Sequence, residues 1–344
     1  MKILFLCSGF NGLTQRAWLA LDRLDHQVMI AATEDPLEME RAVDQYQPEL
    51  IVATYLKARI PESIWANHTT LIVHPGIPGD RGAASLDWAL LRGETIWGVT
   101  ILQAVDKMDA GPVWTYQLFD CPVSSKACLY RHEVTQAATE ALLEAVICFQ
   151  RGNYLPVHPG NLELEKLGRF NRKPTRTELD FEWTDSAASI FLKCLSADSD
   201  PGLLIHLGDQ SYLAFGAQLE SQLTGTPGEI LADQTGAVCI ACGDGAIWFS
   251  HLREIGDQQI KLPASMILRD QLEDIVELDF DPFGEQDQSD FKDIYCKMED
   301  DIAFIHFEVY NGAMGADVCY RLRDVIREAK QRGANMLVLM GGQD

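Results

Sequence analysis

The sequence predicts an α/β protein with a Rossmann-like domain first, then a small β-barrel (OB-like) domain, then an incomplete α/β segment. Over the first 150 residues, short apolar runs alternate with amphipathic helical patterns, which is typical of a parallel sheet covered by helices. Several short strand-like runs with Gly/Asp turns follow, and these favour a barrel. The chain closes with two strands, one helix and one strand.

Composition limits the function classes that the chain can serve. Its 51 acidic and 28 basic residues give a net charge of −23, so we expect no nucleic-acid partner, although a local Arg/Lys pocket for a small anion stays open. No apolar run approaches a membrane span, so we expect no membrane partner. The nine cysteines are odd in number and lie mostly in apolar runs, which indicates reduced thiols and a cytoplasmic protein.

The first domain, residues 1–150, begins with a buried strand at residues 2–7, which reads better as a strand than as a signal peptide. The remaining predicted strands share short apolar runs, and they cover residues 27–32, 49–54, 71–74, 98–103 and 113–118. The predicted helices show apolar residues three and four apart, and they follow residue 16 and cover residues 36–46, 61–66, 85–91 and 129–150.

The rest of the chain divides by composition. Residues 151–183 hold several prolines and little periodicity, so we predict an extended linker. Residues 184–268 form the predicted barrel, opened by a capped helix that runs to about Ser196. Residues 269–293 are strongly acidic, which indicates a solvated linker. Residues 294–344 include a clear helix at 315–332 and end as if a domain were truncated there.

Two proton-handling side chains follow consecutive predicted strands. His74 ends the strand 71–74, and Asp109 lies in the acidic turn after the strand 98–103. In an open α/β sheet, ligands bind just beyond the strand ends. Alone, His74 would be a capped strand-end histidine and Asp109 a turn residue. Together they indicate a site for general acid–base chemistry.

A second candidate contact is the turn between the first strand and its helix. Gly9, Asn11, Gln15 and Arg16 lie in this turn or at the start of the helix, where free N–H groups and the helix dipole favour an anion. An ordinary βα loop explains the pattern equally well. Cys239 and Cys242 form one Cys-x-x-Cys without a second pair, so we expect strand residues and no metal.

The central motifs together resemble those of the formyltetrahydrofolate-dependent formyltransferases. These motifs are His74, the Pro/Gly loop ending in Arg81-Gly82, Gly98-Val-Thr-Ile101 and the acidic turn 106–112. Residues 184–262 resemble the small barrel that follows the catalytic domain in the tRNA-type enzymes. Residues 302–307 and 337–342 resemble the start of a crotonase (enoyl-CoA hydratase-like) domain. This combination is similar to the HypX/HoxX family of hydrogenase-maturation factors.

The resemblance implies formyl transfer from 10-formyltetrahydrofolate to coenzyme A, followed by decarbonylation of formyl-CoA in a crotonase domain. The carbon monoxide would become a ligand of the nickel-iron hydrogenase centre, with hydrogenase-maturation proteins as partners. His74 would donate to the formyl oxygen and Asp109 would manage protons. Anionic parts of coenzyme A or folate would contact the 9–16 turn, Arg81 and Arg131, unless these arginines are merely solvated or salt-bridged. The pterin side would involve Val99, Gln103, Val105 and Met108, of which Val105 and Met108 can equally be core residues.

One position departs from the family. The formyltransferases usually place an asparagine two residues before the histidine as an oxyanion donor, and here that residue is Ile72. Losing such a donor typically costs about 100- to 1,000-fold in rate. Two alternatives to formyl transfer to coenzyme A stay open. One is a methionyl-tRNA formyltransferase, which the acidic charge disfavours, and the other is a non-catalytic folate- or CoA-binding scaffold. The truncated end also predicts that this chain makes formyl-CoA without releasing carbon monoxide.

Overall fold

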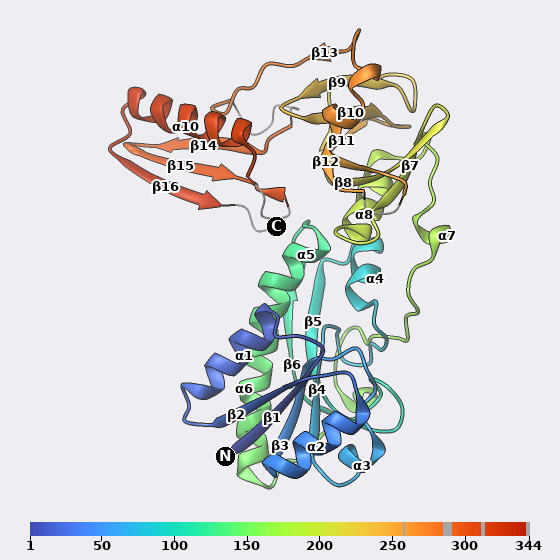
Figure 1. Cartoon of the computed structure of the whole chain (residues 1–344), viewed down its shortest axis with the longest axis vertical. Coiled ribbons are helices and arrows are strands. Elements are labelled where there is room, and N and C mark those ends of the chain that lie inside the picture. The colour runs from blue at the N-terminus through green and yellow to red at the C-terminus, as the bar shows by residue number, and fades with distance from the viewer. Residues whose placement is uncertain (257–258, 285–290, 311–313, 342–344) are drawn as a thin grey trace. The chain divides into compact units, whose positions relative to one another are not determined.

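The computed structural model describes residues 1–256, 259–284, 291–310 and 314–341. The chain divides into two compact units. Unit 1 comprises residues 1–124 and 129–174, and unit 2 comprises residues 125–128 and 175–344. Each unit has its own sheet and its own buried core (Figure 1).

Unit 1 is built on a six-stranded sheet with the order β2-β1-β3-β4-β5-β6. The first four strands are parallel, and they are β1 (Lys2–Cys7), β2 (Gln27–Ala32), β3 (Leu50–Tyr55) and β4 (Thr70–His74). In β1 every residue after Lys2 is buried, as expected for a parallel strand that helices cover on both faces. The Rossmann-like α/β fold predicted for this part of the chain is confirmed.

Helices cover both faces of this sheet. One face carries α1 (Gly12–Asp22) and α6 (Thr135–Arg151), which pack against each other, and a π-helical turn (Tyr130–Val134) leads into α6. The other face carries α2 (Pro36–Tyr46) and α3 (Glu62–Trp65), whose apolar side chains join those of β1 and β3 in one core cluster. The short helix α4 (Ser85–Leu91) also belongs to unit 1, whereas most of the short helix α5 (Lys126–Leu129) belongs to unit 2.

The direction of β5 corrects one expectation. β5 (Ile96–Gln103) runs antiparallel to β4, with Thr100 opposite His74 and Gln103 opposite Leu71, and β6 (Val113–Asp120) is antiparallel to β5. The end of β5 therefore does not meet the end of β4, and the sequence-based reason for placing Asp109 beside His74 was wrong. Asp109 lies in the loop that joins β5 to β6, and its Oδ2 is nevertheless 3.8 Å from His74 Nδ1.

The stretch that we predicted as a linker packs on unit 1 over residues 151–174. Val157 pairs with Val113 of β6, Gly168 N donates to Pro78 O at 2.8 Å, and Asn171 N donates to Arg81 O at 2.9 Å. A short 3-10 turn lies within this stretch (Pro159–Asn161). The irregular loop after β4 needs partners for its backbone groups, and the 151–174 segment supplies them.

Unit 2 begins with α7 (Arg176–Leu179) and α8 (Ala187–Ala197), and its main sheet has the order β13-β9-β10-β11-β8-β7, with β12 on β11. The strands are β7 (Leu203–Leu207), β8 (Gln210–Glu220), β9 (Ile230–Gln234), β10 (Ala237–Ala241), β11 (Ala246–Glu254), β12 (Leu262–Pro263) and β13 (Val276–Glu277). Short turns follow β12, namely α9 (Ala264–Ile267) and a 3-10 turn (Arg269–Gln271). Within the described ranges β7 and β13 are the two edge strands of the sheet and do not pair with each other, so a closed barrel stays a prediction.

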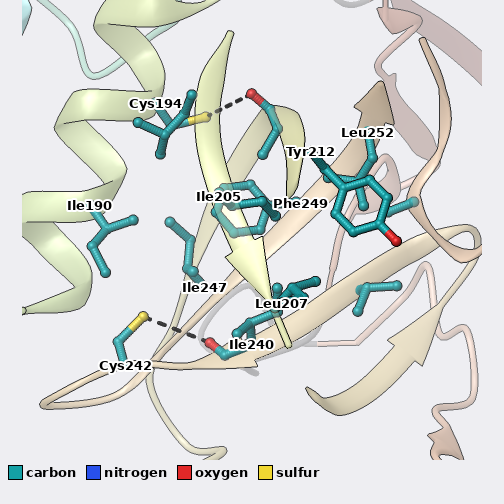
Figure 2. Packing of buried hydrophobic residues seen from close by; sticks show 14 of the residues in the cluster. Ile190, Cys194, Ile205, Leu207, Tyr212, Ile240, Cys242, Ile247, Phe249 and Leu252 are labelled. Carbon is teal, nitrogen blue, oxygen red and sulfur yellow. Dashed lines mark hydrogen bonds between the residues drawn. The ribbon is translucent and has the colours of Figure 1, made fainter. Parts of the chain in front are cut away.

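The core of this sheet is apolar and lies beneath α8. Ile190, Ile247 and Phe249 are fully buried in it (Figure 2). Cys239 and Cys242 are buried too, and burial raises the pKa of both thiols, that of Cys242 to about 12. The part of the chain that the structure describes contains no group of three side chains suited to a metal ion.

A second sheet in unit 2 follows the predicted order of two strands, a helix and a strand. β14 (Ile294–Glu299) is antiparallel to β15 (Ile302–Phe307), and β15 is parallel to β16 (Met336–Gly341). Helix α10 (Ala316–Gln331) buries Val325 and Ala329 against this sheet. Parts of the predicted acidic linker (285–290) and of the predicted last segment (311–313 and 342–344) lie outside the described residues.

No helix among the residues described is both long and apolar enough to cross a lipid bilayer.

Candidate active site

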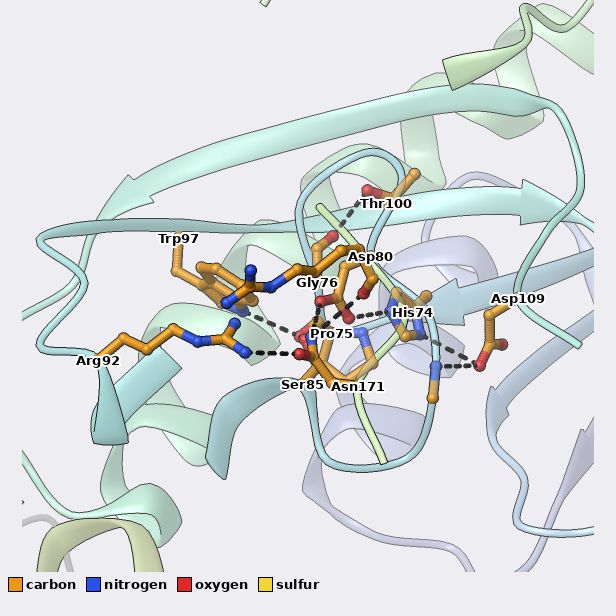
Figure 3. A network of polar contacts seen from close by, with 12 residues as sticks. His74, Pro75, Gly76, Asp80, Ser85, Arg92, Trp97, Thr100, Asp109 and Asn171 are labelled. Carbon is orange, nitrogen blue, oxygen red and sulfur yellow. Dashed lines mark hydrogen bonds and ion pairs between the residues drawn. The ribbon is translucent and has the colours of Figure 1, made fainter. Parts of the chain in front are cut away.

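His74 lies at the end of β4 with its ring between two carboxylates (Figure 3). Its side chain is only 4% exposed. Nε2 is 2.9 Å from Asp80 Oδ1, and Nδ1 is 3.8 Å from Asp109 Oδ2. The histidine is therefore a buried group with one carboxylate in direct hydrogen-bond contact and another close by.

The loop after His74 is held by side chains from α4 and β5. Ser85 Oγ and Trp97 Nε1 both donate to Pro75 O, at 2.6 and 3.2 Å. Thr100 Oγ1, opposite His74 in the sheet, donates to Gly76 O at 2.7 Å. These contacts satisfy two buried carbonyl groups and fix the course of the loop.

Gly76 leaves the space in which these groups meet. A β-carbon added at this position would lie 2.7 Å from His74 Nε2, from Asp80 Oδ1 and from Ser85 Oγ. Contacts below 3 Å with carbon require a neighbour to move. Only glycine at this position lets Asp80 fold back onto His74.

Asp80 is buried, with an exposed fraction of 1%, and both of its oxygens have partners. Oδ1 faces His74, and Oδ2 accepts a hydrogen bond from Asn171 Nδ2 at 2.7 Å. Asn171 Oδ1 in turn accepts from Arg92 Nη2 at 2.8 Å (Figure 3). Burial lowers the pKa of Arg92 and so does nearby Arg169, whereas Glu94 and Asp80 raise it.

Asp109 projects from the loop between β5 and β6. Its backbone has a left-handed φ of +51°, which non-glycine residues seldom adopt. Its Oδ2 accepts a hydrogen bond from Gly82 N at 3.1 Å, and the side chain is 13% exposed. The loop thus holds one partly accessible carboxylate close to the Nδ1 face of His74.

The first turn of the chain lies at the same edge of the sheet, after β1. Asn11 Oδ1 caps α1 by accepting from Thr14 N at 3.0 Å, and its Nδ2 donates to Tyr130 OH at 3.3 Å. Burial raises the pKa of Tyr130 to about 12, although the hydrogen bond from Asn11 opposes the shift. Arg131 follows Tyr130 directly, so the fold brings Arg131 close to Asn11 from far along the chain.

The other residues predicted to bind substrate differ in accessibility. Gln15 and Arg16 are exposed on α1, and Gly9 is half-buried before it. Gln15 Nε2 donates to Phe10 O at 3.0 Å. Arg131 is also exposed. These cationic and amide groups are accessible to an anion.

Arg81 and the pterin-side residues complete that set. Arg81 is half-buried in a backbone bridge to Phe170. Val99 is fully buried in β5 and serves the core, whereas Met108 is 54% exposed, so the core alternative does not hold for Met108. Val105 is half-buried, and Gln103 Oε1 accepts from Trp114 Nε1 at 3.2 Å.

Sequence reasoning missed three members of the site. Asp80 lies in the Pro/Gly loop after His74, but no role was predicted for it. Arg92 follows a short helix, and no local pattern marks it as a site residue. Asn171 lies in the stretch predicted as a linker, but in the structure only 4% of it is exposed. A polar residue so far along the chain carries no local signal that it will meet Asp80.

The arrangement suits movement of a single proton. A neutral imidazole beside a carboxylate can accept a proton and stabilise the resulting imidazolium, as in catalytic triads. With Nε2 engaged by Asp80, only Nδ1 can serve a substrate. Asp109, next to Nδ1, can assist the same proton.

Comparison with known families gives two matches along the chain. Residues 7–146 match the formyl transferase model, and residues 173–267 match the formyl transferase C-terminal domain model. The first match covers the sheet of unit 1 with His74 and Asp109, and the second covers α8 and the sheet that follows it.

Similar proteins extend the match over the whole chain. The hydrogenase maturation factor HoxX of Bradyrhizobium diazoefficiens is 34% identical over 347 aligned residues, covering 100% of this chain and 59% of that protein. The crystal structure of HypX from Aquifex aeolicus in complex with tetrahydrofolic acid is 40% identical with a TM-score of 0.91, and covers 100% of this chain and 60% of that one. The chain therefore spans about three fifths of the length of these relatives.

A more distant structure shares the fold alone. Methionyl-tRNA formyltransferase from Clostridium thermocellum is 16% identical with a TM-score of 0.52, and covers 65% of this chain and 95% of that one.

Proposed function

We propose that the chain transfers a formyl group from 10-formyltetrahydrofolate to coenzyme A, because residues 7–146 and 173–267 match formyl transferase models and the whole chain matches HypX and HoxX proteins. The observation that carries this proposal is the buried His74, held by Asp80 on one ring nitrogen and adjacent to Asp109 on the other. The tetrahydrofolate complex of the HypX relative supports folate as the formyl donor.

The chemistry follows from the free face of His74. The thiol of coenzyme A gives its proton to Nδ1 while its sulfur attacks the formyl carbon, which forms the S–C bond. The imidazolium Nδ1–H then donates to the formyl oxygen, which is the role that the family resemblance implies for His74. When the bond between the formyl carbon and N10 breaks, the same proton moves to N10. The products are formyl-CoA and tetrahydrofolate, with no net proton change.

Asp109 assists in this scheme by electrostatics. Its carboxylate is 3.8 Å from Nδ1 and stabilises the imidazolium while the proton is held there. A thiolate is a strong nucleophile, so the reaction depends less on an oxyanion donor at the position of Ile72.

Substrate positions are proposed from charge and accessibility. The folate side uses the loop with the half-buried Val105 and the exposed Met108, while the phosphates of coenzyme A contact Arg131 and the 9–16 turn. A turn leading into α1 offers backbone N–H groups and a positive dipole end to a phosphate. Arg131→Ala and Arg16→Ala are expected to raise the KM for coenzyme A without changing that for the folate.

The wider role is proposed from the relatives. A hydrogenase maturation factor that makes formyl-CoA would supply the carbon monoxide ligand of a nickel-iron centre after decarbonylation. Residues 294–344 are proposed as the start of the crotonase-like domain that would perform this second step, and maturation proteins in the cytoplasm would be its partners.

The test mixes the purified chain with 10-formyltetrahydrofolate and coenzyme A and follows both products by mass spectrometry. Wild type is expected to make formyl-CoA and tetrahydrofolate in equal amounts, and His74→Ala is expected to make neither. Folate binding without any product would contradict the proposal and favour a non-catalytic scaffold. Formylation of initiator methionyl-tRNA in a parallel assay would favour the tRNA reaction instead.

A further inference from the structure

Four side chains form one directed chain of hydrogen bonds that ends on His74. Arg92 Nη2 donates to Asn171 Oδ1 at 2.8 Å, and Asn171 Nδ2 donates to Asp80 Oδ2 at 2.7 Å. Asp80 Oδ1 is 2.9 Å from His74 Nε2. Figure 3 shows these contacts, which link Arg92 at the end of α4, Asn171 in the 151–174 segment, and Asp80 in the loop after β4. Asp80 and Asn171 are almost fully buried.

Arg92 sets the direction of these hydrogen bonds. A guanidinium has donors only, so it must face the oxygen of the Asn171 amide. The amide nitrogen then faces two acceptors, Asp80 Oδ2 and the backbone oxygen of Arg169 at 3.2 Å. In this orientation the amide oxygen faces a donor and the amide nitrogen faces acceptors, which excludes the flipped orientation.

This orientation also determines which nitrogen of the His74 ring carries the hydrogen. Asp80 Oδ2 accepts from Asn171, and a carboxylate offers only acceptors on its other oxygen. The contact at Oδ1 therefore needs a hydrogen on His74 Nε2. In the neutral ring this places the free lone pair on Nδ1, on the side of Asp109.

We propose that Asp80 and Asn171 are positioning residues that hold His74 in its Nε2–H tautomer, so that Nδ1 faces the reacting thiol as a base. This inference rests on the proposed function for the identity of the thiol, whereas the tautomer itself does not depend on any substrate. Arg92 orients the amide of Asn171, and Gly76 leaves the room for the contact.

Asp80→Asn tests the inference because it changes one oxygen to an amide nitrogen at constant shape. The new side chain cannot accept from His74 and from Asn171 at the same time, so the tautomer is no longer held. An Asp-to-Asn change in a serine protease triad lowers kcat by about 10⁴-fold for this reason. Here we expect a fall in kcat of at least about 100-fold, with the KM for folate within about threefold.

An exchange of the two side chains is the matched rescue. In Asp80→Asn combined with Asn171→Asp, the aspartate accepts from Arg92 and from the new amide, whose oxygen accepts from His74. The order of donors toward His74 is restored, although the contact with the backbone oxygen of Arg169 is lost. We expect the double variant to be at least about tenfold faster than Asp80→Asn. Asp120→Asn, an exposed carboxylate on β6, is the control and should match wild type.

The second readout is the ¹⁵N spectrum of the histidine rings, assigned for His74 with the His74→Gln variant. Wild type without substrate is expected to show a protonated Nε2 and an unprotonated Nδ1, and Asp80→Asn to lose this pattern. The opposite tautomer in wild type, a fall in kcat below tenfold in Asp80→Asn, or no recovery in the double variant would each overturn the inference. If wild type shows the expected tautomer but makes no formyl-CoA, the proposed function fails and the positioning role stands.

Discussion

His74 Nδ1 and Asp109 Oδ2 lie 3.8 Å apart, beyond the reach of a direct hydrogen bond but close enough for strong electrostatic interaction. Hydrogen bonds at an active site often tighten only when the substrate is bound. Asp109 is also tied to Gly82 N by a hydrogen bond of 3.1 Å, so the carboxylate cannot swing away freely. Its distance to the imidazole suits a group that acts once a proton sits on Nδ1.

Replacing Asp109 by asparagine should separate binding from chemistry. The amide keeps an oxygen for Gly82 N–H but loses the charge that stabilises the imidazolium. We expect kcat to fall by about 100- to 10,000-fold, while the dissociation constant for tetrahydrofolate changes by less than about threefold. Steady-state kinetics and calorimetry measure the two. Asp106→Asn, in the same loop but 82% exposed and paired with Arg59, is the control, and an equal loss in both variants would contradict the assignment.

Gly76→Ala should disturb the site more than the fold. The added carbon would lie 2.7 Å from His74 Nε2 and Asp80 Oδ1, so one of these side chains must move. We expect kcat to fall at least about 100-fold, with a loss of about 1–3 kcal/mol in the free energy of unfolding. Kinetics and urea unfolding check both values. Gly315→Ala meets no atom within 4 Å and should leave kcat unchanged, and an active Gly76→Ala enzyme would refute the crowding argument.

Ile72 should resist the asparagine that related formyltransferases place there. It packs against an apolar cluster that includes Leu6, Ile51 and Ala104. An amide at this position loses apolar contact and must find polar partners, which costs about 1–3 kcal/mol of unfolding free energy. Ile72→Val keeps the apolar contact and should cost about 0.5–1.5 kcal/mol. Thermal unfolding distinguishes them, and an Ile72→Asn variant as stable as Ile72→Val would contradict this prediction.

His251 should make unit 2 sensitive to acid. It stacks on Tyr310 with ring centroids 4.6 Å apart. Burial, and then the charge of Lys261, lower the pKa of His251 to about 4. The folded state therefore favours the neutral ring, so its contribution is present above the unfolded pKa of about 6.5 and is lost as the pH falls toward 4.

The measurement compares unfolding at pH 7 and pH 5. We expect His251→Phe to remove about 2 kcal/mol of the stability difference between these two pH values, because phenylalanine keeps the stacking surface but does not titrate. His206→Gln, at an exposed position on β7, should keep the pH dependence of wild type. Equal acid sensitivity in wild type and His251→Phe would argue against a buried neutral histidine.

The local elements were predictable, but two long-range relationships were not. An apolar run such as β5 has the same pattern whether its neighbour is parallel or antiparallel, so the sequence could not reveal that β5 reverses beside β4. Asn171 lies 91 residues after Asp80, in a stretch without periodicity, and nothing local indicates that it enters the site. The loop that contains Asp80 is recognisable as a motif in the sequence, but the role of Asp80 depends on its contact with Asn171.

The sequence by itself determined the order and type of most elements, the resemblance to formyltransferases and the choice of His74 and Asp109 as candidate catalytic residues. It did so because side-chain periodicity and turn residues act within a few positions of each other. Only the tertiary structure decided how the loop 104–112 returns to His74 and that Asp80, rather than solvent, holds Nε2. Those contacts arise where buried polar groups must find partners, and the partner that is available depends on the packing of the whole unit.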